Sequence, residues 1–141
     1  MKQNLELRGA ATKKTIARFQ PKPYGLGFGD CARMIATHLK NMGRPVVALN
    51  QVKQYKSLLG AQRALLAATG HDNLLDAMSE HFPEKAPARC FIGDVIAMPS
   101  ELPIGALGIY TGNGSVFAYS AESEFPVFGR IIEPIKAWEI L

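Results

Sequence analysis

Cys31 is the residue of this chain whose type and position best suit a nucleophile. It directly follows Asp30, a residue type that favours the N-cap of a helix, and the residues after it repeat with helical spacing. A cysteine in a first helical turn faces unpaired backbone N–H groups and the positive end of the helix dipole. Because both lower the pKa of a thiol, this position predicts a nucleophilic Cys31.

A general base for Cys31 is hard to find in the sequence. Acyl transfer needs an imidazole within hydrogen-bond reach of the thiol and a third group that orients the imidazole. His38 lies on the same predicted helix, but seven residues separate it from Cys31, roughly 10 Å along the axis, too far for direct proton transfer. His71 and His81 have no motif around them, which favours surface or satisfied core positions.

The remaining chemistry-bearing residues favour structural roles. The two cysteines and three histidines show no ligand spacing such as Cys-x-x-Cys, so neither a metal nor another cofactor is expected. Without a base, we interpret Cys31 as a small buried side chain more readily than as a reactive thiol. Cys90 is expected in the core, and Asp94 is expected to organise a turn through its side chain.

Helical patterns dominate the first 82 residues. A helix rich in Ala, Lys and Arg is predicted over 5–19, and a second one over 31–42 with Asp30 as its N-cap. A third helix is expected over 57–69, and a shorter one follows, capped by Asp72. The expected core face of the third helix is Leu58, Leu59, Leu65 and Leu66.

Strand patterns dominate the rest of the chain. Short β-rich runs occupy 91–98, 105–111, 115–119, 127–132 and 137–141, and Asn113-Gly114 between two of them indicates a hairpin. Residues 46–49 are expected to form a strand or an extended linker, and 83–89 a polar connector. Helices first and an antiparallel sheet second predict an α+β fold, with N-terminal helices packed on a C-terminal antiparallel β-sheet.

The length of 141 residues suits one domain. We expect a single domain over 1–141, made of a basic helix and loop (1–28), a cysteine helix with a helical insert (29–82) and an antiparallel sheet (91–141). No long apolar stretch or signal-peptide pattern is present, so neither a membrane anchor nor export is expected. Two cysteines are too few for a disulfide framework, and we expect free thiols in a reducing compartment.

Basic residues are concentrated in the first third of the chain. Residues 1–44 contain nine Lys or Arg against Glu6 and Asp30, whereas the whole chain has a net charge of +4. Clustered Lys and Arg suit phosphate binding, so a nucleic-acid-binding module is one alternative. Because no aromatic residues are interleaved with these charges, we favour a solvated face or a surface for an acidic protein partner.

Several motifs, taken in order, resemble a known family. They are Asp30-Cys31 at a helix start, GDVI at 93–96, LGIYTGNG at 107–114 and AWEI at 137–140. This order is similar to that of NlpC-type cysteine peptidases of the papain-like superfamily, especially a divergent branch found among bacteriophage tail proteins. The resemblance covers most of the chain and implies a papain-like NlpC-type fold.

The resemblance also implies that the catalytic site is degenerate. Active members carry the catalytic histidine two residues before the glycine of the Gly-Ile-Tyr strand, a position that is Ala106 here. Their third polar residue falls on the strand after the hairpin, at Ala118. Because alanine neither accepts a proton nor orients an imidazole, Cys31 would be a vestigial nucleophile.

The function implied by the resemblance is structural. We expect an inactive component of a bacteriophage tail tip or tail-assembly apparatus, located in the virion and made in the host cytoplasm. The expected partners are other tail tip or hub proteins, with peptidoglycan as a further candidate, and neither nucleic acid nor a membrane. An active cysteine peptidase or amidase that cleaves peptidoglycan with Cys31 is the alternative.

The surface expected to meet such partners has two parts. Lys13, Lys14 and Arg18 on the basic helix would pair with an acidic protein, and Phe125 and Phe128 would supply apolar anchors.

Overall fold

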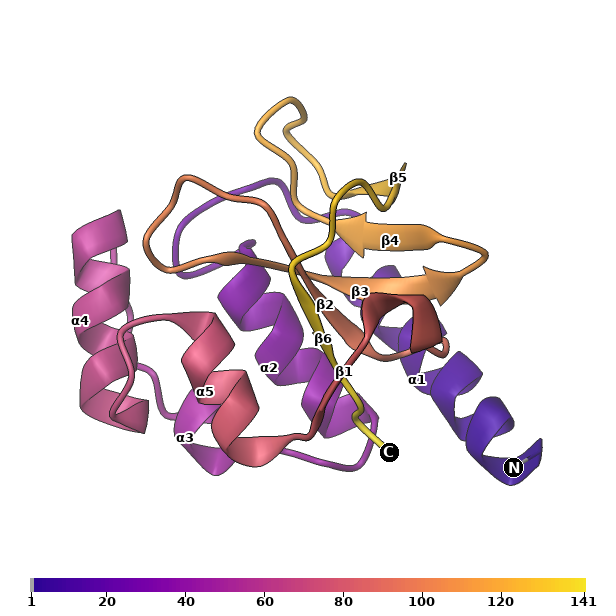
Figure 1. Cartoon of the computed structure of the whole chain (residues 1–141). Helices are drawn as coiled ribbons and strands as arrows, with labels where there is room; N and C mark the ends of the chain where they lie inside the picture. The colour runs from indigo at the N-terminus through magenta and orange to yellow at the C-terminus, as the bar shows by residue number, and fades with distance from the viewer. Residues whose placement is uncertain (1) are drawn as a thin grey trace.

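The helices precede the sheet along the chain, which confirms the predicted α+β class (Figure 1). The computed structural model describes the backbone of residues 2–141 and the side chains from Asn4 onward; Met1, which opens the predicted segment 1–28, lies outside the described residues. The elements are α1 (Lys2–Phe19), α2 (Cys31–Asn41), α3 (Val47–Asn50), α4 (Leu58–Thr69), α5 (Leu74–His81), β1 (Glu84–Lys85), η1 (Pro87–Arg89), β2 (Val95–Met98), β3 (Ala106–Gly112), β4 (Ser115–Ala118), β5 (Val127–Arg130) and β6 (Lys136–Trp138).

Helix α2 is the centre of the core. Its apolar stripe of Met34, Ile35 and Leu39 is fully buried and belongs to one hydrophobic cluster with Leu107 of β3 and Phe117 of β4. Burial of such side chains is the main favourable contribution to folding. The N-terminus of α2 therefore has a fixed position relative to the strands.

The sheet is antiparallel throughout, in the order β1-β6-β2-β3-β4-β5. The predicted hairpin joins β3 and β4, and both Asn113 (φ 53°) and Gly114 (φ 74°) adopt the left-handed conformation. A two-residue hairpin with positive φ at both positions selects Asn-Gly because few other residue pairs tolerate it. This hairpin puts Ala106 and Ala118 on neighbouring strands.

Two predictions about local structure were wrong between α2 and β2. Residues 46–49 do not form a strand: Val46 is the N-cap of the short helix α3, and the Leu49 N–H donates to the Val46 carbonyl at 3.0 Å. Both side chains are buried, so packing on one side overrides the β preference of valine. The connector 83–89 contains strand β1, which pairs with β6, and helix η1.

The expected core face of α4 was also wrong in part. Ala61 and Leu65 are buried, whereas Leu59 and Leu66 are 57% and 50% exposed. Helix α4 lies at the edge of the molecule (Figure 1), so only a narrow stripe of its apolar surface meets the core. The N-cap of α5 is Asn73 and not Asp72, since the Asn73 side chain accepts the Asp76 N–H at 2.9 Å.

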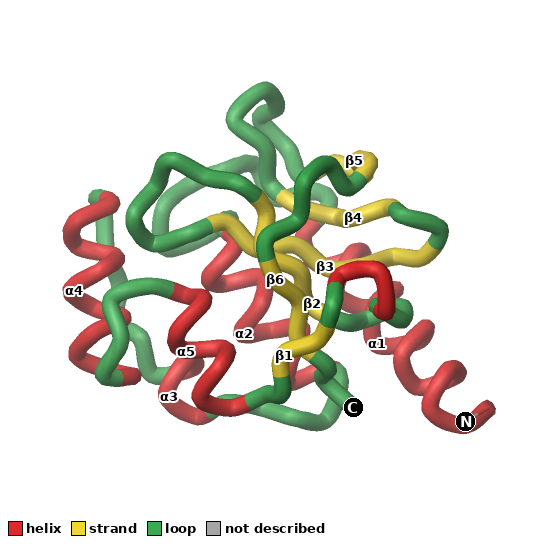
Figure 2. The backbone as a smooth tube through the Cα atoms, viewed as in Figure 1, coloured by secondary structure: helices red, strands yellow, loops and turns green. Residues whose placement is uncertain are grey.

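Three long loops gather where α2 begins. They connect α1 to α2 (residues 20–30), β2 to β3 (99–105) and β4 to β5 (119–126), and Figure 2 shows them on the same side of the sheet. Residues from all three line one cavity with the first residues of α2. None of the helices in residues 2–141 combines the length and apolar composition that a membrane crossing requires.

Candidate functional site

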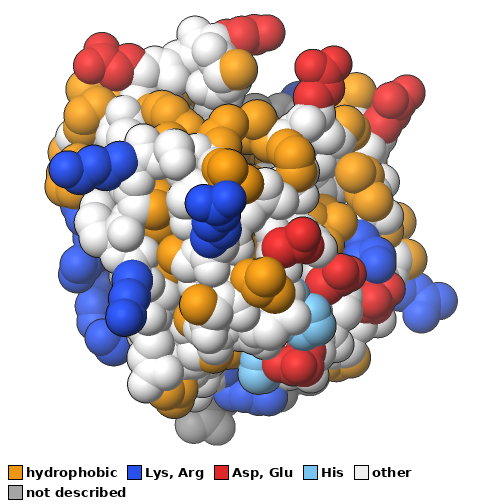
Figure 3. All heavy atoms as spheres, turned by 90° about the vertical axis from the view of Figure 1, so that its left-hand side faces the viewer, with side chains coloured by type: hydrophobic (Ala, Val, Ile, Leu, Met, Phe, Trp, Pro, Cys, Tyr) orange, Lys and Arg blue, Asp and Glu red, His pale blue; other side chains and the backbone are white. Residues whose placement is uncertain are grey.

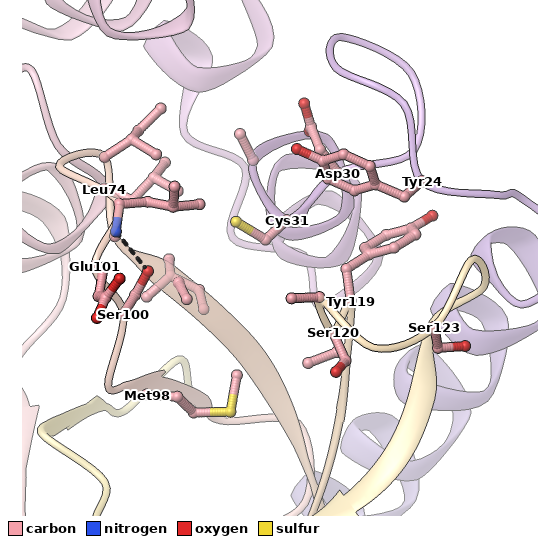
Figure 4. A pocket seen from close by; sticks show the side chains of 18 of the residues that line it. Tyr24, Asp30, Cys31, Leu74, Met98, Ser100, Glu101, Tyr119, Ser120 and Ser123 are labelled. Atoms are coloured by element: carbon pink, nitrogen blue, oxygen red, sulfur yellow. Dashed lines mark hydrogen bonds between the residues drawn. The ribbon is translucent and has the colours of Figure 1, made fainter. Parts of the chain in front are cut away.

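A cleft of about 1040 Å³ opens at the N-terminus of α2. Its lining includes Cys31 from α2, Ala106 from the start of β3 and Ala118 from the end of β4. The fold thus brings together the three residues that the sequence resemblance singled out. Figure 4 shows the Cys31 thiol directed into the cleft, between Leu74 on one side and Tyr119 on the other.

Asp30 begins α2 as predicted and holds the loop before it. Its Oδ1 accepts the Arg33 N–H at 2.9 Å, while its Oδ2 accepts the Gly27 N–H at 2.9 Å and the Tyr55 hydroxyl at 2.5 Å. We call these four residues the Asp30 cluster. The carboxylate is buried, and all the donors in the cluster are uncharged groups. A negative charge therefore lies directly beside Cys31.

Gly29 allows this arrangement because of its missing side chain. A Cβ at this position would lie 2.3 Å from the Pro23 carbonyl oxygen and 2.8 Å from the Tyr119 hydroxyl oxygen. Any other residue would push the chain away from Tyr119 and displace the start of α2. The packing of the loop thus requires a glycine directly before Asp30.

The surroundings of Cys31 do not favour a thiolate, although its position at a helix start by itself would. The pKa of the Cys31 thiol is raised from 9.0 to about 11, chiefly by burial and in smaller part by the charge of Asp30. Backbone N–H groups, among them that of Leu107, lower the pKa but do not compensate for the burial. The desolvation penalty of the thiolate exceeds its stabilisation by the N-terminus of the helix, so Cys31 is a neutral thiol at pH 7.

The histidines lie elsewhere. His38 is fully buried; its Nε2 donates to the Gly93 carbonyl at 2.8 Å, and its Nδ1 lies 2.9 Å from the Thr15 hydroxyl. Burial lowers the pKa of His38 to about 4, so the ring is a neutral crosslink between α1, α2 and the Gly93 turn. His71 and His81 both pair with Glu80 on the surface of α5. No histidine is among the described residues that line the cleft.

Asp94 was expected to organise a turn, and it does, because its Oδ2 accepts the Phe91 N–H at 2.9 Å. It also pairs with Arg8 at 2.8 Å and Lys85 at 2.9 Å, and Oδ1 accepts the Ile140 N–H at 3.2 Å. We call these five residues the Asp94 cluster. Sequence reasoning missed the two ion pairs because Arg8 and Asp94 are 86 positions apart and no local pattern connects them.

Cys90 departs from its predicted core position. It is only half-buried, and burial raises the pKa of its thiol to about 11. Both cysteines are free within the part of the chain that the structure describes. In that same part, no group of three or more His, Cys, Asp or Glu side chains is arranged to hold a metal ion.

Two tyrosines of the cleft were not singled out from the sequence. Tyr24 and Tyr119 contact edge to face with ring centroids 6.1 Å apart, and the Tyr119 hydroxyl donates to the Lys22 carbonyl at 3.0 Å. Burial, with a further contribution from Asp30, raises the pKa of Tyr119 to about 12 and that of Tyr24 above its usual value. Both rings are therefore neutral, and they form an aromatic wall beside Cys31.

Comparison with known proteins identifies a family whose function is open. A search of the curated proteins finds no match. One family model, described as a domain of unknown function (DUF6950), matches residues 5–140. This match spans α1 to β6 and includes every residue of the cleft. By that match, the chain belongs to the DUF6950 family.

Proposed function

We propose that this protein is a papain-like domain of the NlpC type that has no hydrolase activity and acts by contact in a bacteriophage tail tip or tail-assembly apparatus. The order of its elements supports the fold: a cysteine at the start of a helix, a helical insert, and then an antiparallel sheet. The common cleft of Cys31, Ala106 and Ala118 supports the correspondence with catalytic positions.

The chemistry around Cys31 is the observation that carries the proposal. The resemblance would put the general base and its orienting partner at Ala106 and Ala118, and both side chains are methyl groups. The thiol has a pKa of about 11, raised by burial, and the nearest charge is the carboxylate of Asp30. A cysteine hydrolase needs the opposite arrangement, in which a cationic imidazole stabilises a thiolate.

Hydrolysis of muropeptides tests the absence of activity. We expect no product from the purified full chain at pH 7, at a level where an active NlpC-type peptidase gives complete cleavage. The Ala106→His variant should recover little, since the third polar residue is still missing and Asp30 still disfavours the thiolate. Cleavage that is lost in Cys31→Ala would overturn the proposal and favour the alternative of an active peptidase.

The contact surface of the proposal lies on α1 and on the edge strand β5. Lys13 and Lys14 are exposed on α1. On the other part, Phe128 is 52% exposed and packs on Phe117 with ring centroids 5.0 Å apart, and Phe125 is 42% exposed. Exposed aromatic residues supported by a rigid sheet are typical anchors of protein interfaces.

Co-purification with neighbouring tail proteins tests this surface. We expect Phe128→Ala to weaken co-purification most, because it removes a desolvated anchor, and Lys13→Glu/Lys14→Glu to weaken it at low salt. Leu66→Ala is a control on α4, where an equally exposed side chain lies outside the proposed surface. If all variants co-purify like the wild type, α1 and β5 are not the interface.

A further inference from the structure

The cleft at Cys31 is acidic although the chain as a whole is basic. The net charge of the chain is +4. The charged side chains that line the cleft are four carboxylates and one guanidinium, those of Asp30, Glu101, Glu122, Glu124 and Arg130. Asp30 is engaged in its cluster, whereas the three glutamates are exposed. No described basic side chain pairs with any of the three. These carboxylates are available to a cationic ligand.

The glutamates lie on opposite walls of the cleft. Glu101 belongs to the loop between β2 and β3, and Glu122 and Glu124 belong to the loop between β4 and β5. Figure 4 shows the two walls on either side of the Cys31 thiol, with Leu74, Ser100 and Glu101 on one and Tyr24, Tyr119, Ser120 and Ser123 on the other. In the upper part of Figure 3, acidic side chains surround a largely hydrophobic area of the surface.

The floor between these walls is apolar and uncharged. It is lined by Ile104 and Leu107 together with the neutral thiol of Cys31. Two further apolar side chains are partly exposed at the cleft, Leu102 at 42% and Val127 at 38%. The volume of about 1040 Å³ is at the upper limit of ordinary small-molecule sites. An apolar floor of this size between acidic walls suits a segment of several residues that carries both apolar and basic side chains.

We propose that this cleft docks an extended cationic segment of a partner protein, with an apolar side chain on the floor beside Cys31 and Lys or Arg side chains against Glu101, Glu122 and Glu124. The inference deepens the proposed function, because it rests on a domain that binds without cleaving. It assigns a second surface, which excludes α1 and Phe128 but includes the cleft-lining residues Val127 and Arg130 of β5. Charge complementarity selects the partner: a basic segment is attracted to this cleft and an acidic one is repelled.

Binding of labelled peptides to the full chain tests the proposal. The probe is a short peptide in which lysine alternates with alanine and leucine, followed by fluorescence anisotropy. The comparison peptide has glutamate in place of every lysine. We expect the cationic peptide to bind, the anionic peptide to bind at least about tenfold more weakly, and the affinity of the cationic peptide to fall between 50 and 300 mM salt.

Paired charge-removal variants locate the binding. Glu122→Gln/Glu124→Gln should weaken binding of the cationic peptide about fivefold to tenfold, in line with two exposed ion pairs. Glu101→Gln on the other wall should cause a smaller loss. Glu6→Gln/Glu133→Gln is the matched control, because it removes the same charge from exposed residues outside the cleft. Thermal unfolding of each variant verifies that the fold is intact.

Equal affinity for both peptides would overturn the proposal, and so would a control pair that weakens binding as much as Glu122→Gln/Glu124→Gln. Self-association of the chain that the cleft variants abolish would also overturn it, because the occupant would then be a second copy. Mass spectrometry of the recovered cationic peptide separates the two proposals. Cleavage that depends on Cys31 would refute the non-hydrolytic function while leaving the charge preference of the cleft intact.

Discussion

Asp30 and Asp94 are both buried carboxylates, yet only Asp94 is paired with cations. The Asp94 cluster joins α1, β1 and the residues after β6 through Arg8 and Lys85, and its carboxylate is fully buried. The Asp30 cluster uses two backbone N–H groups and the Tyr55 hydroxyl, and it borders the open cleft. A charge that is neutralised by cations crosslinks the fold, whereas one held only by dipoles imposes its field on its neighbours.

The effect of that field is visible in the groups around Asp30. Its charge contributes to the raised pKa values of Cys31, Tyr24, Tyr55 and Tyr119, after the larger contribution of burial. All four groups are therefore neutral at pH 7. In a cysteine peptidase the surroundings of the nucleophile lower the pKa of its thiol, whereas the surroundings of Cys31 raise it.

The largest effect we predict is the loss of stability in Asp94→Ala. The substitution leaves Arg8, whose side chain is only 4% exposed, without its carboxylate. Breaking a buried ion pair on one side costs about 3–5 kcal/mol in the free energy of unfolding, and urea denaturation measures it. Glu84→Ala is the control, because it breaks only exposed contacts, the pair with Lys136 and the bond from the Ser79 hydroxyl, and should cost much less stability. An equal loss of unfolding free energy in Asp94→Ala and Glu84→Ala would mean that the Asp94 cluster does not crosslink the fold.

The second effect is acid destabilisation through His38. Its pKa is about 4 in the folded chain and about 6.5 in the unfolded chain. Between these values the unfolded chain binds the extra proton, so stability is complete above about pH 6.5 and decreases as the pH falls to about 4, by on the order of 3 kcal/mol. Urea denaturation from pH 7 to pH 4 measures this loss. His38→Gln should be less stable at pH 7 and should lack this part of the pH dependence.

The third effect concerns the dipole-held carboxylate itself. Asp30→Ala removes the N-cap of α2 and leaves the Tyr55 hydroxyl and the Gly27 N–H without their acceptor, for a combined loss of about 2 kcal/mol. Asn73→Ala removes the N-cap of α5 and two exposed side-chain bonds to Asp72 and Asp76, and it should cost about 1 kcal/mol. A loss in Asp30→Ala no larger than in Asn73→Ala would show that the bonds from Tyr55 and Gly27 contribute nothing to stability.

The smallest effect is on reactivity and not on stability. In a Cys90→Ser background, Cys31 should react with iodoacetamide at pH 8 at least about tenfold more slowly in the folded chain than in urea, since folding raises the pKa of its thiol. Asp30→Asn should speed the reaction slightly by removing a nearby negative charge. A folded chain that reacts faster than the unfolded one would contradict the raised pKa and reopen the alternative of an active thiol.

Local signals predicted most of the elements because their causes are local. Asp30 and Ser57 cap α2 and α4 through hydrogen bonds to N–H groups three residues away, and Gly70 ends α4 in the left-handed conformation. The Asn113-Gly114 turn likewise depends on two residues. Where the cause was packing, prediction failed: Val46 belongs to a helix cap, and Leu66 faces solvent.

The sequence by itself determined the start of α2 at Asp30, the end of α4 at Gly70, the hairpin turn at Asn113-Gly114, and that alanines occupy 106 and 118, because each depends on residue type or near neighbours. Only the tertiary structure decided that Asp94 meets Arg8, that His38 is a neutral crosslink, and that glutamates of two separate loops share one cleft. It also decided that the pKa of the Cys31 thiol is raised and not lowered, since burial depends on all the segments that cover a group, whereas the helix dipole depends on one.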